Sequence, residues 1–184
     1  LIPDPEALSK RELARLPRPR IIKTHQYFHP GYGKIILVVR DPRDVAVSLY
    51  YFHIKMRDYA DGHPMEQHIK GLVNNVNPFY GTWGENVTSW IAVRGQHPNF
   101  LLLRYEDMLK NTPEALMKIA DFMGIAVTPE RIATAVERSS ADSMRKLEKL
   151  QALEWSSTKN TRQDIPFVRS AKSGDWRTTL PESC

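Results

Sequence analysis

The chain has 184 residues with a net charge of +5, and 41% of its residues are hydrophobic. These values are ordinary for a soluble globular domain, and no apolar run approaches the roughly 20 residues of a membrane-spanning helix, so we expect no membrane partner. The single cysteine, Cys184, excludes an internal disulfide and fits a reducing compartment. The basic excess favours anionic partners, but the basic residues are spread along the chain, which argues against a nucleic-acid surface.

The first third of the chain predicts two helices and two strands. A helix is expected at residues 5–16, a short strand at residues 20–25, and a loop rich in proline and glycine at residues 26–33. The apolar run at residues 35–39 predicts a buried strand, and residues 44–56 have helix-compatible spacing. A strand, a tight turn and a helix therefore follow one another directly.

The rest of the chain predicts one more buried strand, at residues 99–105, among several helices. Two of these helices begin with a Thr-Pro-Glu start signal. The predicted helices span residues 65–75, 83–95, 112–124, 128–138 and 140–153, and a loop without a period follows at residues 156–173. Because strands alternate with helices, we expect an α/β fold with a parallel sheet flanked by helices, in one domain over residues 1–184.

Arg40 follows the predicted strand at residues 35–39, and Ser48 lies about one turn into the helix after it. In open α/β sheets, ligands bind outside the carboxyl ends of the strands. The forked donors of a guanidinium suit a phosphate there, and a hydroxyl and a helix amino end add donors for the same anion. The unit predicts a phosphate site; the alternative is an ordinary strand–helix unit with a salt-bridged Arg40.

Lys23 and His25 stand at the end of the short strand at residues 20–25. A histidine at such a place can serve as a general base, and a lysine two residues earlier points to the same side of an extended strand. If the strands are neighbours in one sheet, both ends open onto one crevice. The alternative is a polar strand end without a catalytic role. The other histidines show no ligand spacing, so we predict no metal site.

Tyr105 and residues 169–177 are further candidates for ligand binding. Tyr105 ends the last predicted strand, where its ring either stacks on a base or packs at the rim of the core. Residues 169–177 hold three cations, two hydroxyls and a glycine, which suit a phosphate or form a solvated basic loop. The chain contains neither G-x-x-x-x-G-K-[ST] nor G-x-G-x-x-G, the usual glycine-rich phosphate loops.

Taken together and in this order, these pieces resemble the cytosolic-type sulfotransferases, which use 3′-phosphoadenosine 5′-phosphosulfate (PAPS). The matching pieces are Pro19-Arg20-Ile21-Ile22-Lys23-Thr24-His25, Arg40-Asp41-Pro42-Arg43-Asp44-Val45-Ala46-Val47-Ser48, Tyr80-Gly81-Thr82-Trp83, Arg104-Tyr105-Glu106-Asp107-Met108, Arg138-Ser139-Ser140 and Gly174-Asp175-Trp176-Arg177. The resemblance covers residues 19–177. It implies a P-loop-NTPase-like fold and transfer of a sulfuryl group from PAPS to an acceptor hydroxyl or amine. The implied product is 3′,5′-ADP, and no metal is required.

The resemblance also assigns roles to residues of this chain. His25 is implied as the general base that takes the acceptor proton, and Lys23 as the contact to the transferring sulfuryl group. Phe52 and Trp83 are implied to lie toward the acceptor or in the core.

The implied cofactor-binding residues are Arg40, Ser48, Tyr105, Ser139, Arg169, Ser170 and Ala171. Among them, Arg40, Ser48 and Arg169 hold the 3′-phosphate, whereas Tyr105 and Ser139 lie near the adenine.

The chain departs from the family pattern at both ends of the matched region and in the predicted clamp. The family's Lys-Ser-Gly loop, which cradles the 5′-phosphosulfate, precedes the matched region, so the domain looks partial and its sheet incomplete at the amino terminus. Arg169-Ser170-Ala171 stands where many members have Arg-Lys-Gly. The family's dimerisation segment lies just beyond Trp176, so a homodimer stays open.

The leading hypothesis is a cytoplasmic sulfotransferase that acts on a small-molecule acceptor. The acceptor is open, because the loops at residues 26–33, 57–64 and 154–168 carry aromatic residues that suit an apolar alcohol or pack onto the core. These residues are Tyr27, Phe28, Tyr59, Trp155 and Phe167. The alternative is a non-catalytic module that binds 3′-phosphoadenosine nucleotides. The hypothesis of a nucleic-acid-binding domain is supported only by the net positive charge of the chain, so we predict no nucleic-acid partner.

Overall fold

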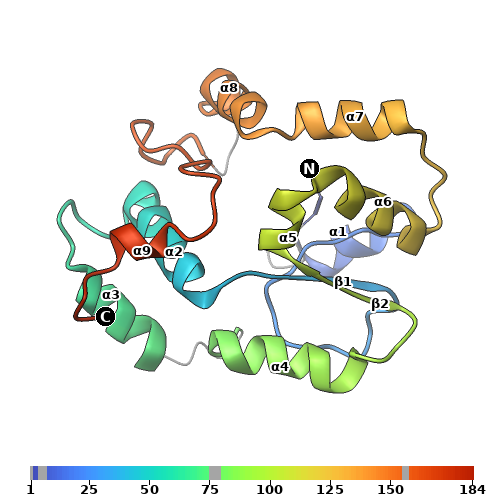
Figure 1. Cartoon of the computed structure of the whole chain (residues 1–184), viewed down its shortest axis with the longest axis horizontal. Helices are drawn as coiled ribbons and strands as arrows, with labels where there is room; N and C mark the ends of the chain where they lie inside the picture. The colour runs from blue at the N-terminus through green and yellow to red at the C-terminus, as the bar shows by residue number, and fades with distance from the viewer. Residues whose placement is uncertain (1, 4–7, 75–79, 155–157) are drawn as a thin grey trace.

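Two parallel strands lie at the centre of the computed structural model, which describes residues 2–3, 8–74, 80–154 and 158–184 (Figure 1). Strand β1 (Ile35–Val39) pairs with β2 (Phe100–Arg104), and the register runs from Ile35 opposite Phe100 to Val39 opposite Arg104. Because the strands are parallel and end together, Arg40 and Tyr105 leave the sheet at the same edge.

The helices begin where the sequence supplies caps for their first amide groups. Helix α2 (Pro42–Met56) begins after Asp41, whose side chain accepts the N–H of Arg43. Helix α4 (Trp83–Arg94) begins with a capping box of Thr82 and Glu85. The remaining helices are α1 (Lys10–Arg15), α3 (Met65–Asn74), α5 (Tyr105–Lys110), α6 (Thr112–Met123), α7 (Pro129–Arg138), α8 (Ala141–Gln151) and α9 (Trp176–Thr179).

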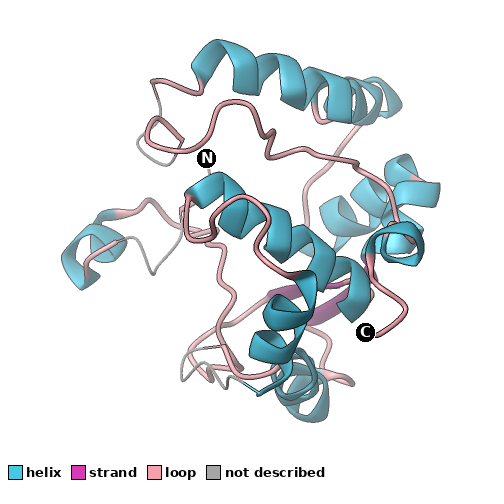
Figure 2. Ribbon diagram, turned by 90° about the vertical axis from the view of Figure 1, so that its left-hand side faces the viewer, coloured by secondary structure: helices cyan, strands magenta, loops and turns pink. Residues whose placement is uncertain are grey.

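The prediction of a parallel sheet flanked by helices is confirmed. Figure 1 shows α5 and α6 on one side of the strands and α4 on the other, while α2, α3 and α9 lie together beyond the carboxyl edge. Helices α7 and α8 extend along the top of the same view, joined by a short connection. Figure 2 shows the strands as a small element surrounded by helices and long loops.

One predicted strand is wrong. Residues 20–25 form no strand, although exposed and half-buried residues alternate along residues 21–25 as in extended backbone. The backbone groups of this segment bond elsewhere: the N–H of Lys23 donates to Pro3 O, and the carbonyl of His25 accepts from the side chain of Asn86. The sequence also did not predict α5 and α9, which are short.

The two strands are less buried than their apolar sequences predict. Ile35 and Leu103 are buried, whereas Ile36, Val38 and Leu102 keep 36%, 49% and 43% of their surface exposed. The predicted helix at residues 5–16 is observed as α1, and residues 5–7 lie outside the described residues, as do Asn75 and Trp155. Across the described residues, no helix has both the length and the apolar character needed to cross a membrane.

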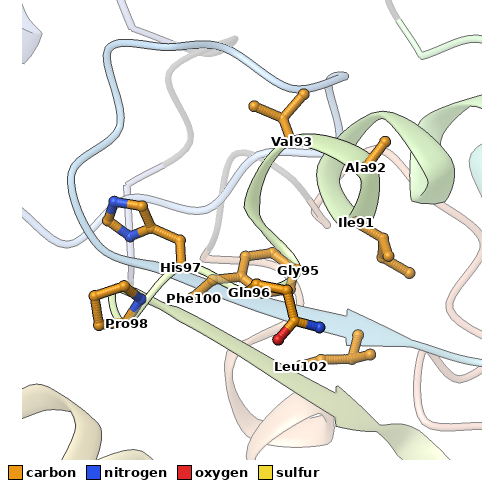
Figure 3. A pocket seen from close by; sticks show the side chains of 9 residues that line it. All are labelled: Ile91, Ala92, Val93, Gly95, Gln96, His97, Pro98, Phe100 and Leu102. Carbon is orange, nitrogen blue, oxygen red and sulfur yellow. The ribbon is translucent and has the colours of Figure 1, made fainter.

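A pocket lies at the amino end of β2, against the end of α4 (Figure 3). Apolar side chains such as Ile91 and Leu102 line much of it, together with His97 and Gln96. Because Arg40 and Tyr105 follow the carboxyl ends of the strands, this pocket lies away from the predicted phosphate site.

Candidate functional site

Arg40 is held at the carboxyl edge of the sheet by three neighbours. Its Nη2 donates to the carbonyl of Lys172 (3.1 Å) and lies 4.0 Å from Asp44 Oδ2, and its guanidinium lies 4.6 Å from the centre of the Tyr105 ring. Its Nε is buried and has no hydrogen-bond partner among the described residues. The salt-bridged Arg40 of the alternative interpretation is thus present, but one buried donor stays available for an anion.

Asp44 fastens the segment after Lys172 to the first turn of α2. Its side chain is 1% exposed, and its two oxygens accept the N–H groups of Gly174 (2.7 Å) and Trp176 (3.1 Å). Figure 1 accordingly shows α9 beside α2. Since the same carboxylate lies near Arg40, it orders both the guanidinium and the segment that supplies the Lys172 carbonyl.

The sequence predicted that the amino end of α2 offers donors to an anion, but in the structure a carboxylate of the chain itself lies there. Asp41 caps it, accepting the N–H of Arg43 (2.9 Å) and its Nε and Nη2 (3.0 and 2.7 Å), so the helix end already holds a carboxylate. The side-chain hydrogen bond from Arg43 lowers the pKa of Asp41. The N–H of Asp41 donates to Glu106 Oε1 (2.8 Å), which ties the ends of the two strands together. The Arg43 guanidinium also lies 3.7 Å from the centre of the Trp176 ring.

Ser48 and Arg169 both lie beside α2. Ser48 is exposed in the second turn of the helix, four residues after Asp44 and therefore on the same face. The Arg169 guanidinium lies 4.3 Å from the centre of the ring of Tyr51, three residues after Ser48, and forms an ion pair with Asp175. Ser48 therefore lies on α2, and Arg169 packs against the same helix.

The backbone at residues 168–169 is also held from α8. Arg145 donates to the carbonyls of Val168 (2.8 Å) and Arg169 (2.9 Å). Ser170 and Ala171 are half-buried, and Ala171 has φ of +53°, a left-handed conformation that favours glycine. This left-handed backbone explains why the family resemblance leads us to expect glycine at position 171.

Ser139 lies at the end of α7 and is exposed. Its hydroxyl donates to the carbonyl of Ala135 (2.7 Å). Ser140 next caps α8, which carries Arg145 toward Arg169. Ser139 thus stands at the junction before the helix that supports the predicted clamp.

Lys23 and His25 are exposed and belong to a second group around the start of α4. The ring of His25 meets that of Tyr80 edge to face, with centroids 6.5 Å apart. Trp83, the first residue of α4, is 41% exposed and so is not a core residue. The predicted common crevice rested on residues 20–25 being a strand, and the observed backbone does not supply that strand.

Phe52 is 40% exposed and packs beside Phe167, with ring centroids 6.1 Å apart. The ammonium group of Lys55 lies 4.4 Å from the centre of the Phe167 ring and is buried. It donates to the carbonyls of Arg162 (3.0 Å) and Ile165 (2.6 Å) and pairs with Glu148 (3.0 Å). This network joins α2, α8 and the following loop beneath Phe52.

The sequence interpretation missed the supporting roles of Asp44, Lys55 and Asn86. Asp44 carried one usable signal, a carboxylate in the first turn of a helix that follows a strand-end arginine. Lys55 and Asn86 carried none, because Arg162, which bonds Lys55, and His25, which bonds Asn86, lie 107 and 61 residues away from them in sequence.

These features define an α/β protein with a cationic clamp at the carboxyl edge of its parallel sheet. Residues 4–184 match the family described as the sulfotransferase domain. The chain therefore belongs to that family.

Curated relatives and solved structures agree with this assignment. The chain is 33% identical over 168 residues to 3-beta-hydroxysteroid sulfotransferase of Cavia porcellus and 32% identical over 170 residues to sulfotransferase 2A1 of Rattus norvegicus. In both cases 86% of this chain covers 57% of the relative. The structure also resembles that of retinol dehydratase in complex with androsterone and the inactive cofactor PAP, with a TM-score of 0.79 and 26% identity. That match covers 94% of this chain and 52% of retinol dehydratase.

Proposed function

We propose that the chain forms part of a single sulfotransferase domain, residues 1–184, that transfers a sulfuryl group from PAPS to an acceptor hydroxyl or amine. The observation that carries the proposal is the clamp at the sheet edge, where Arg40, fixed by Asp44 and Tyr105, keeps a buried Nε without a partner among the described residues. A P-loop-NTPase-like sheet is part of the same proposal and rests on membership of the family.

In this proposal Arg40, Ser48 and Arg169 bind the 3′-phosphate. The three residues lie along α2 and its preceding strand end, and two guanidiniums supply the charge that a phosphate dianion requires. Ser170 and Ala171 present backbone to the same phosphate. Tyr105 and Ser139 lie toward the adenine; the Tyr105 ring is already engaged by Arg40 on one side.

His25 is proposed as the general base and Lys23 as the cation beside the transferring group. PAPS supplies an activated sulfuryl group: the acceptor oxygen forms the new bond to sulfur while the bond from sulfur to the 5′-phosphate oxygen breaks. A ring nitrogen of His25 takes the proton of the acceptor hydroxyl, and Lys23 stabilises the charge that develops on the transferring sulfuryl group. Both side chains are exposed and therefore accessible to reactants.

The proposed acceptor is an apolar small-molecule alcohol. The named relatives include a 3-beta-hydroxysteroid sulfotransferase, and retinol dehydratase has been solved with androsterone and with retinol. Phe52, beside Phe167, and the exposed Trp83 offer apolar surface of that kind. Cytoplasmic location is a prediction of the family resemblance. The same resemblance leaves open whether the protein forms a homodimer.

The first experiment is calorimetric titration of the chain with 3′,5′-ADP, with 5′-AMP as the ligand that lacks the 3′-phosphate. We expect 3′,5′-ADP to bind more tightly, and Arg40→Ala to weaken it by about 10-fold to 100-fold, as expected for a charge-assisted hydrogen bond. Arg104→Ala is the matched control, because it removes an exposed cation at the same edge. Equal binding of both nucleotides by the folded chain would reject the 3′-phosphate clamp.

Catalysis is tested separately, by following sulfuryl transfer from PAPS to a panel of hydroxysteroids. His25→Ala should lower kcat at least about 100-fold while the variant still binds 3′,5′-ADP. Nucleotide binding without transfer, by a protein that also carries the family's 5′-phosphosulfate loop, would favour the non-catalytic module instead.

A further inference from the structure

Asn86 uses both hydrogens of its side-chain amide on two backbone carbonyls. Its Nδ2 donates to the carbonyl of His25 (2.8 Å) and to that of Tyr80 (2.9 Å). Asn86 is half-buried and lies in the first turn and a half of α4. The amide therefore joins two segments that are 55 residues apart, residues 25 and 80, at a helix that is itself fixed by its capping box.

The same face of α4 holds the chain after His25. Trp90 Nε1 donates to the carbonyl of Gln26 (3.2 Å), and Ser89 Oγ accepts the N–H of Phe28 (3.0 Å). Asn86, Ser89 and Trp90 stand at positions i, i+3 and i+4, which share one helix face. These three side chains therefore bond the backbone of residues 25–28 to α4.

The turn into α4 packs closely on the segment that contains His25. Gly81 has φ of +64°, and a Cβ at this position would clash with the ring of Tyr27. The carbonyl of the preceding residue, Tyr80, is held by Asn86, and the Tyr80 ring meets the His25 ring edge to face. Asn86 thus fixes the backbone of both residues in this ring pair.

We propose that Asn86 is a positioning residue for His25, which it orients by holding the His25 carbonyl and the backbone of the adjoining Tyr80. The inference rests on the proposed function insofar as His25 is the general base. The imidazole itself stays exposed for the acceptor, while its backbone is anchored on a helix. Losing the amide frees the ring to leave the orientation in which it takes a proton.

The test compares the wild-type chain with Asn86→Ala and with Asn86→Asp, which keeps the side-chain shape but cannot donate to either carbonyl when ionised. Asn111→Ala is the matched control, since Asn111 is likewise an asparagine with side-chain hydrogen bonds, but it caps α6 and lies away from His25. The readouts are the His25 ring resonances in two-dimensional NMR, kcat and KM for sulfuryl transfer, and the Kd of 3′,5′-ADP.

Both Asn86 variants should shift the His25 ring resonances and lower kcat about 10-fold to 100-fold, with KM for PAPS and Kd for 3′,5′-ADP within about twofold. Asn111→Ala should leave the His25 resonances in place. Unmoved His25 resonances in folded Asn86 variants would overturn the proposal, as would unchanged kcat. If the wild-type chain binds 3′,5′-ADP no more tightly than 5′-AMP, the proposed function fails, whereas the His25 resonances still decide whether Asn86 orients His25.

A measurement on the wild-type chain needs no variant. The two side-chain amide protons of Asn86 are hydrogen-bonded to carbonyls. They should therefore exchange with solvent much more slowly than the side-chain amide protons of the exposed Asn160. Exchange as fast as that of Asn160 would contradict the proposal even if every Asn86 variant failed to fold.

Discussion

Asp44 and Gly174 are joined by a 2.7 Å hydrogen bond across 130 residues of chain, with the carboxylate of Asp44 accepting the backbone N–H of Gly174. The second oxygen of Asp44 accepts the N–H of Trp176, and the same side chain lies 4.0 Å from Arg40. A single buried carboxylate therefore links α2, the helix after β1, to the segment at residues 174–176. The proposed phosphate clamp depends on this link for its geometry.

Replacing Asp44 with Asn should disturb stability and nucleotide binding together. The new amide group faces a backbone N–H, so one of the two charge-assisted hydrogen bonds is lost and the other is weakened. We expect a loss of about 3 kcal/mol in the free energy of unfolding in urea, and at least about tenfold weaker binding of 3′,5′-ADP. Asp107→Asn, at an exposed carboxylate, is the control. Normal nucleotide binding by the Asp44 variant would show that the link does not shape the clamp.

Lys55 and Glu148 form a buried ion pair that anchors the loop before Arg169. The Lys55 Nζ is 3.0 Å from Glu148 Oε1 and donates to two loop carbonyls, and the Lys55 side chain is 2% exposed. Lys55→Met leaves Glu148 without its cation, so we expect a loss of about 3–5 kcal/mol in the free energy of unfolding.

The control for this pair is Lys118→Met, because Lys118 forms an ion pair with Glu114 at 2.7 Å on an exposed helix face. That variant should unfold at nearly the wild-type urea concentration. Adding Glu148→Gln to Lys55→Met should recover part of the lost stability. A double variant as unstable as the sum of the single variants would show that the two charges are not coupled.

Ala171→Gly should stabilise the protein. A left-handed backbone at φ of +53° costs a residue with a Cβ about 1 kcal/mol, and glycine removes that cost at the price of a more flexible unfolded chain. We expect a gain of up to about 1 kcal/mol in urea unfolding. Ala133→Gly, on the exposed face of α7, is the opposite control and should lose stability, because its backbone is helical. Destabilisation by Ala171→Gly would contradict the prediction.

The sequence predicted the parts of the site that are local in the chain. Arg40 follows an apolar run and precedes an Asp-Pro turn, so its place at a strand end could be read directly, and the Thr-Pro-Glu signals gave the starts of α6 and α7. Such features need only the neighbouring residues, because capping and periodicity act within one or two turns.

The sequence could not predict the contacts that join distant segments. Residues 20–25 were predicted as a short strand, but their partners are Pro3 and a side chain of α4, which no local pattern reveals. From the sequence, Lys55 is expected to be a surface residue near the end of a helix. In the structure it is buried, because three oxygen acceptors surround its ammonium group. Propensity describes how an element forms, whereas tertiary partners decide which polar groups it buries.

His68 should make the stability of the fold depend on pH. It is 1% exposed; its Nε2 donates to the carbonyl of Ala46 (2.9 Å) and its Nδ1 accepts from the hydroxyl of Tyr59 (3.0 Å), so the neutral ring satisfies both bonds. Burial lowers the pKa of His68 below its ordinary value of 6.5. His53, which pairs with Asp58, and His63 lie nearby and disfavour a further positive charge.

Because the unfolded chain binds the proton more readily than the folded one, the contribution of His68 is fully present above about pH 6.5 and is lost as the pH falls below it. The free energy of unfolding should decline toward pH 5, with His68 contributing at most about 1.4 kcal/mol per pH unit. His68→Gln, which does not titrate, should flatten this decline in urea unfolding measured from pH 5 to pH 8. His97→Gln, at an exposed histidine, should keep the wild-type slope. An unchanged slope in His68→Gln would assign the acid sensitivity to other groups, and the burial of a neutral imidazole would then not govern it.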